Sequence, residues 1–83
     1  MNFQPAAWQV RRARTWLMRW NASHPDRAMP WEWVEEMLLA WRAWKEQASH
    51  APQEALAHHQ RYQEFASKLP QRLVTDIDLE GQA

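Results

Sequence analysis

Residues 30–48, PWEWVEEMLLAWRAWKEQA, carry apolar side chains at every third or fourth position. An α-helix turns by about 100° per residue, so side chains at this spacing lie on one face and form an apolar stripe. Pro30 opens the segment, where the first turn of a helix tolerates proline. The segment predicts an amphipathic helix with this stripe: Trp33, Val34, Met37, Ala40, Trp41, Trp44 and Ala48.

Two further segments have helical spacing and are bounded by prolines. Proline breaks a helix interior but is accepted at its start, and Pro5, Pro52 and Pro70 stand at such boundaries. Short connections favour antiparallel neighbours. The expected fold is all-α, a compact three-helix bundle made by residues 1–70. The predicted helices cover about residues 5–21, 30–48 and 52–69.

The remaining residues, 71–83, differ from the helices in pattern. Leu73, Val74, Ile77 and Leu79 are interleaved with acidic residues. Chain ends are poorly ordered unless they are tied down. We expect an acidic, partly apolar C-terminal tail that is either an extended strand-like arm or frayed.

Length and composition limit the class of protein. A chain of 83 residues forms one domain, and its ten basic residues balance its ten acidic ones. It contains no cysteine, which excludes disulfides and thiolate metal sites and favours a cytoplasmic location. No apolar run approaches the roughly 18 residues of a membrane span. These features predict a soluble cytoplasmic protein.

The charge is nevertheless uneven along the chain. Residues 1–29 hold five arginines against one acid, Asp26. Four of these arginines lie on the outer side of the first predicted helix, beside Trp8: Arg11, Arg12, Arg14 and Arg19. Such a face can be solvated, can dock on an acidic protein surface, or can contact nucleic-acid phosphates. The zero net charge argues against a dedicated nucleic-acid-binding protein.

Seven tryptophans, all within the first 44 residues, are many for a domain of this size to bury. Several large apolar residues fall at or outside the stripe edges: Trp8, Met18, Trp31, Leu38, Leu39 and Leu56. Helix ends and the tail can cover them, or they form a patch for a partner or for a second copy of the chain. The candidate partner-binding residues are Trp8, Arg11, Arg12, Met18, Arg19, Trp31 and Leu39.

No residue pattern indicates catalysis or metal binding. His58 and His59 are adjacent, so they do not have the i, i+4 spacing of a helical zinc pair. Ser23, His24 and Asp26 lie in one loop, whereas a catalytic triad converges from separate segments. We expect no catalytic residue, cofactor or metal ion.

The tripeptide His24-Pro25-Asp26 lies between a basic helix and a second helix. This arrangement resembles the J-domain co-chaperones of heat-shock ATPases, whose signature is His-Pro-Asp in the loop after a basic helix. The resemblance implies that the tripeptide stimulates the ATPase of such a chaperone, with Arg27 as the basic residue that commonly follows it. The chain departs from the family because residues 1–8 do not supply its tyrosine-rich first helix.

These observations favour a small non-catalytic protein-binding module: an adaptor, an assembly chaperone or an inhibitor of a larger complex. Small phage and mobile-element proteins often have this profile, which is an argument by analogy. The expected partner is a protein, and a protein with an acidic surface is one candidate. Homodimerisation, nucleic-acid binding through the first helix and J-domain-like co-chaperone activity are the alternatives.

Overall fold

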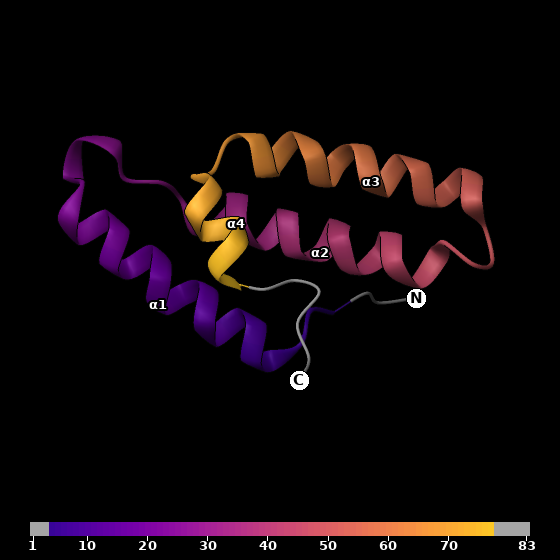
Figure 1. Cartoon of the computed structure of the whole chain (residues 1–83), viewed down its shortest axis with the longest axis horizontal. Coiled ribbons are helices and arrows are strands. Elements are labelled where there is room, and N and C mark those ends of the chain that lie inside the picture. Colours follow the sequence, from indigo (N-terminus) through magenta and orange to yellow (C-terminus); the bar gives the residue numbers. More distant parts are fainter. Residues whose placement is uncertain (1–3, 78–83) are drawn as a thin grey trace.

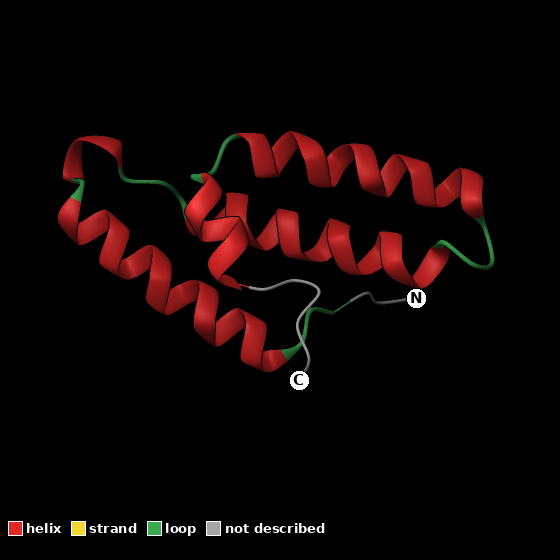
Figure 2. Cartoon of the chain, viewed as in Figure 1, coloured by secondary structure: helices red, strands yellow, loops and turns green. Residues whose placement is uncertain are grey.

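The computed structural model describes residues 4–77, and this part of the chain is helical with no strand (Figures 1 and 2). A 3₁₀ turn, Pro25–Arg27, lies in the connection between the first two helices. The helices are α1 (Ala7–Ser23), α2 (Trp31–Gln47), α3 (Pro52–Ser67) and α4 (Gln71–Ile77). The all-α class is therefore confirmed, and the fourth helix is an addition to the predicted three.

The prolines determine where the helices begin. Pro30 directly precedes α2, Pro52 is the first residue of α3, and Pro70 separates α3 from α4. Proline fits these positions because the first amide groups of a helix have no intrahelical acceptor. Each of the three predicted helices has ends within two residues of the observed ones.

α2 is the central helix of the arrangement. It runs antiparallel to α3, its closest packing partner, while α1 lies on its other side and diverges from it (Figure 1). None of the helices in residues 4–77 has the length and apolarity needed to cross a membrane.

Residues 71–77 correct the prediction for the tail. They form neither an extended arm nor a frayed end, but α4, which contacts both α1 and α3. Leu73 and Ile77 are 0% exposed, because their i, i+4 spacing places them on one helical face that closes the core. The rest of the predicted tail, residues 78–83, lies outside the described residues.

Leu38 is a second correction. Its position at the edge of the α2 stripe predicts partial exposure, yet its side chain is only 1% exposed. Val34 and Met37 are fully buried on the same helix, in one cluster with Leu73 and Ile77 of α4. Because α2 is packed against neighbours on more than one side, its buried arc is wider than a single stripe.

Candidate protein-docking surface

The outward side of α1 carries four positively charged side chains. Arg11, Arg12, Arg14 and Arg19 are all exposed, and none pairs with a carboxylate within residues 4–77. The helix itself contains no acidic residue. We use the term α1 face for the residues that lie on its outer arc: Trp8, Arg11, Arg12, Thr15, Met18 and Arg19.

Most tryptophan rings are covered by cations of the same chain. Six of the seven lie within 4.5–5.7 Å of an arginine or lysine side-chain cation, measured to the ring centre. Trp8, which is half-buried, has Arg12 over its ring at 5.4 Å. Trp31, also half-buried, has Arg14 over its ring at 4.5 Å. The two tryptophans singled out from the sequence are thus partly sheltered by neighbouring arginines.

Met18 is one of two large apolar residues that are exposed within residues 4–77. Its side chain is 69% exposed, compared with 56% for Leu56 on α3. It borders a pocket of about 390 Å³ between α1 and the start of α2. We call this the Met18 pocket, and its lining residues are Arg14, Thr15, Leu17, Met18, Asn21 and Trp31.

A second pocket, of about 370 Å³, lies on the other flank of α1. We call it the arginine pocket, and its lining residues are Arg11, Arg12, Thr15, Trp16 and Arg19. Trp16 is held in place because its indole nitrogen donates a 2.8 Å hydrogen bond to the Asp76 carboxylate of α4. Thr15 belongs to both pockets, so the two form one surface across α1.

The connection between α1 and α2 is fixed by side-chain contacts, which positions the Met18 pocket. The Asn21 amide donates to the Met29 carbonyl at 3.0 Å, and the Met29 amide donates to the Asn21 side-chain oxygen at 2.9 Å. The Trp20 indole donates to the Arg27 carbonyl at 3.2 Å. Because this loop leads directly into α2, the contacts set where Trp31 lies relative to α1. The pocket is therefore largely preformed.

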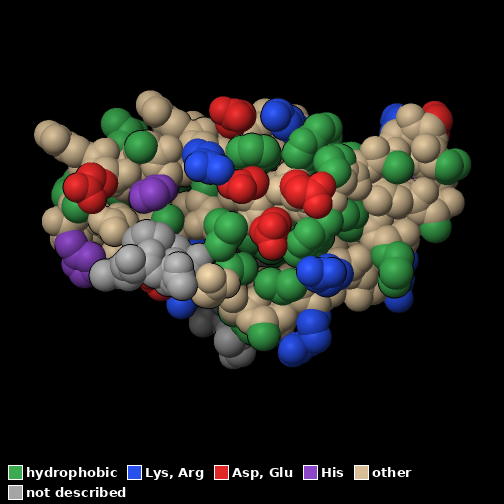
Figure 3. Space-filling model, turned by 180° about the vertical axis from the view of Figure 1, so that it is seen from behind, with side chains coloured by type: hydrophobic (Ala, Val, Ile, Leu, Met, Phe, Trp, Pro, Cys, Tyr) green, Lys and Arg blue, Asp and Glu red, His purple; other side chains and the backbone are tan. Residues whose placement is uncertain are grey.

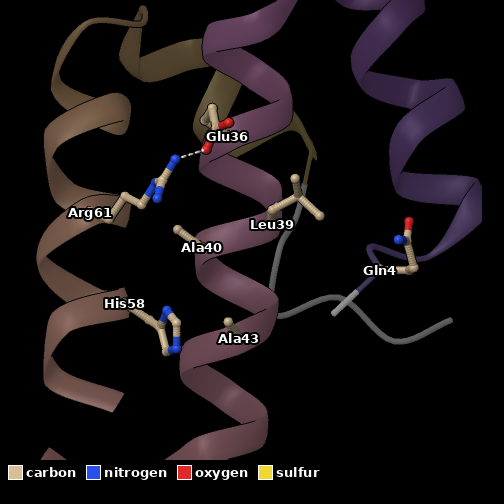
Figure 4. A pocket seen from close by; sticks show the side chains of 7 residues that line it. All are labelled: Gln4, Glu36, Leu39, Ala40, Ala43, His58 and Arg61. Atoms are coloured by element: carbon tan, nitrogen blue, oxygen red, sulfur yellow. Dashed lines mark hydrogen bonds and ion pairs between the residues drawn. The ribbon is translucent and has the colours of Figure 1, made fainter. Parts of the chain in front are cut away.

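Leu39, the remaining candidate from the sequence, lies in a different place. It is half-buried on α2 and lines a pocket of about 370 Å³ bordered also by α3 (Figure 4). Across that pocket, Arg61 of α3 pairs with Glu36 of α2. Leu39 thus lines neither the Met18 pocket nor the arginine pocket.

Acidic side chains occupy another part of the surface. Seen from behind, they gather near the middle of the molecule with hydrophobic side chains between them (Figure 3). Among the described helices, α2 carries four acidic residues against two basic ones: Glu32, Glu35, Glu36 and Glu46 against Arg42 and Lys45. α2 thus carries net negative charge, whereas α1 carries net positive charge.

The His24-Pro25-Asp26 tripeptide forms part of the fixed loop. The His24 ring stacks on Trp20 with 3.9 Å between ring centres and is half-buried. Pro25 and Asp26 are exposed in the 3₁₀ turn. Within residues 4–77, no three acidic or histidine side chains come together in a way that could hold a metal ion.

The sequence reasoning missed three residues that shape the docking surface. Thr15 joins the two pockets, Asn21 fixes the loop, and Trp16 forms the wall of the arginine pocket. An asparagine near a helix end is a weak signal for such a loop contact. Comparison with known proteins adds nothing to this geometry, since no family model, curated protein or solved structure matches the chain.

Proposed function

We propose that this protein is a small non-catalytic protein-binding module that docks on its partner through the α1 face and the Met18 pocket. The observation that carries the proposal is the exposed Met18 beside a preformed pocket, next to four arginines that pair with no carboxylate of residues 4–77. Apolar anchors combined with arginine are typical of residues that dominate protein–protein binding energy. An adaptor, an assembly chaperone or an inhibitor of a larger complex would use such a surface.

The structure changes which residue we regard as the anchor. Arg12 and Arg14 lie over the Trp8 and Trp31 rings, so both indoles are better suited to shape the surface than to insert into a partner. Met18 is unbranched, flexible and exposed, and methionine adapts to partners of different shape. We therefore assign the central contact to Met18, with Trp31 as a wall of its pocket.

Two observations favour a protein partner over nucleic acid. Base stacking needs an open aromatic ring, whereas on α1 Trp8 lies under Arg12 and Trp16 stacks on Trp20 at 5.5 Å. The net charge of the whole chain is also zero, which argues against a dedicated nucleic-acid-binding protein.

A capture experiment with matched variants tests the proposal. Tagged wild type, Met18→Asp, Arg12→Glu and Leu56→Asp are incubated with bacterial lysate, with and without nuclease, and bound proteins are identified by mass spectrometry. We expect a stoichiometric partner that survives nuclease, is retained by Leu56→Asp and is lost by the other two variants. Leu56→Asp is the control because it places the same charge on an exposed apolar residue of another helix.

Other outcomes contradict the proposal. Loss of the captured material on nuclease treatment would assign the arginines to nucleic acid. Equal loss of the partner by Leu56→Asp would mean that capture reflects general stickiness. Capture of a heat-shock ATPase that Met18→Asp retains and that an added variant, His24→Ala, loses would favour J-domain-like co-chaperone activity. Circular dichroism of each variant verifies that the helix content is unchanged.

A further inference from the structure

We infer that the partner presents an acidic, extended segment with one large apolar side chain, and that this segment crosses α1 over Thr15. The inference rests on the proposed function and specifies its partner. In this arrangement the apolar side chain enters the Met18 pocket, and carboxylates of the same segment reach the arginine pocket on the opposite flank.

The direction of the segment follows from where the two pockets lie on the helix. Arg11, Thr15 and Met18 follow one another at i, i+4 and i+7, so they form a ridge along the outer side of α1. The Met18 pocket extends from this ridge toward Leu17 and Asn21, and the arginine pocket extends toward Trp16. A segment lying parallel to the helix on one flank would fill only one pocket. A segment that fills both has to pass over the ridge.

The size and lining of the Met18 pocket indicate what enters it. At about 390 Å³ it stands at the lower end of the range for ligand sites, which suits a side chain better than a large ligand. Leu17, Met18 and the Trp31 ring supply apolar contact, while the loop held by Asn21 keeps the pocket open before binding. Preformed pockets reduce the ordering cost of binding. A leucine, methionine or phenylalanine side chain fits this chemistry.

The arginine pocket indicates the charge of the segment. Arg11, Arg12 and Arg19 border it, and arginine binds carboxylates through paired hydrogen bonds. A helix with its side chains is about 10–12 Å across, and an extended chain advances about 3.3 Å per residue. The apolar anchor and the nearest carboxylate are therefore expected to be about three or four residues apart.

The same charges argue against a symmetric pair of these chains joined through α1. Such a pair would place four arginines of one copy against four of the other, without a carboxylate on either helix. Like charges facing each other across an interface are strongly unfavourable. An acidic segment of a different protein would instead place carboxylates opposite these arginines, so this repulsion would not arise.

Selection from a displayed library of random 12-residue peptides tests the inference on the full-length protein. We expect enriched peptides with a large apolar residue and acidic residues three or four positions away. The best peptide, labelled with fluorescein, is then titrated by anisotropy against wild type, Thr15→Trp, Thr15→Ala, Met18→Asp and Leu56→Asp. Thr15 is exposed, so tryptophan there obstructs the ridge without disturbing the core.

The expected pattern distinguishes a crossing segment from other modes of binding. Thr15→Trp and Met18→Asp should each raise the Kd for the peptide by ~10-fold or more, about 1.4 kcal/mol. Thr15→Ala and Leu56→Asp should change this Kd by less than ~2-fold. The inference is overturned if no peptide is enriched, if the enriched peptides are basic or lack an apolar residue, or if Thr15→Trp binds like wild type.

The design separates failure of this inference from failure of the proposed function. If Thr15→Trp binds the peptide like wild type while Met18→Asp still fails to capture the partner, the surface binds protein but the segment does not cross α1. If Met18→Asp also captures the partner as well as wild type does, both the inference and the proposed function are wrong. A fluorescein-labelled single-stranded 20-mer DNA, titrated at low and physiological salt, is the last probe. Tight, steeply salt-dependent binding that Arg12→Glu abolishes would overturn the inference in favour of nucleic acid.

Discussion

Replacing Leu73 with alanine removes a side chain that closes the core from α4. Leu73 is 0% exposed and belongs to the same buried cluster as Leu17 of α1 and Met37 of α2. The substitution leaves a cavity because α4 is held on both sides, by α1 and by α3, and cannot collapse freely into the space. Its cost therefore measures how firmly α4 is built into the fold.

The magnitude follows from two quantities. Leucine-to-alanine changes at fully buried sites cost about 2.7–5 kcal/mol. A domain of 83 residues has a total free energy of unfolding of roughly 4–12 kcal/mol at 0.05–0.15 kcal/mol per residue. We expect Leu73→Ala to lose about 3 kcal/mol, which corresponds to a fall in Tm of about 12–24 °C for a domain of this size.

Urea denaturation followed by circular dichroism and tryptophan fluorescence provides the assay. Leu56→Ala is the matched control, since the same change at a 56% exposed position of α3 should cost no more than about 0.5 kcal/mol. A loss below about 1 kcal/mol for Leu73→Ala would contradict this prediction, because it would mean that α4 is not part of the cooperative core.

Three further predictions concern the loop, the tryptophans and the arginine face. Asn21→Ala removes both hydrogen bonds to Met29 and should cost about 1–3 kcal/mol in urea unfolding, whereas a change below about 0.3 kcal/mol would show that the loop is fixed otherwise. Trp31→Phe should destabilise the protein less than Trp41→Phe. The Trp31 indole nitrogen is a buried donor without an acceptor within the described residues, whereas Trp41 is a buried core residue. The reverse order of Tm values in thermal unfolding would contradict this prediction. Arg12→Glu should change the free energy of unfolding by less than about 1 kcal/mol, since within residues 4–77 it removes the contact with the Trp8 ring and no ion pair. A larger loss would make Arg12 unsuitable as a binding probe.

The main helices could be predicted because proline position and apolar spacing act locally. The stripe in residues 30–48 and the prolines at 52 and 70 are sufficient to place α2 and α3 within two residues of their observed ends. The fourth helix was missed because polar and apolar residues alternate in the sequence from Asp76 to Glu80, a pattern that also suits an extended arm. A seven-residue helix is marginal alone and depends on tertiary contacts, here those of Leu73 and Ile77 with the core.

The docking surface was predictable only in part. The outward position of Met18 and of the α1 arginines follows from helical spacing, and the structure places them there. The shelter of Trp8 by Arg12 and of Trp31 by Arg14 depends on side-chain placement, which spacing alone does not determine. The Met18 pocket also requires the approach of α2 to α1, which the Asn21 contacts with Met29 establish.

The measurement that most directly tests the role of the α1 face is the Kd of the captured partner for Met18→Asp and Leu56→Asp, determined side by side by biolayer interferometry. We expect Met18→Asp to raise the Kd by ~10-fold or more, about 1.4 kcal/mol, while Leu56→Asp stays within ~2-fold of wild type. Equal Kd values for the two variants would contradict it, because binding would then not depend on the exposed methionine of α1.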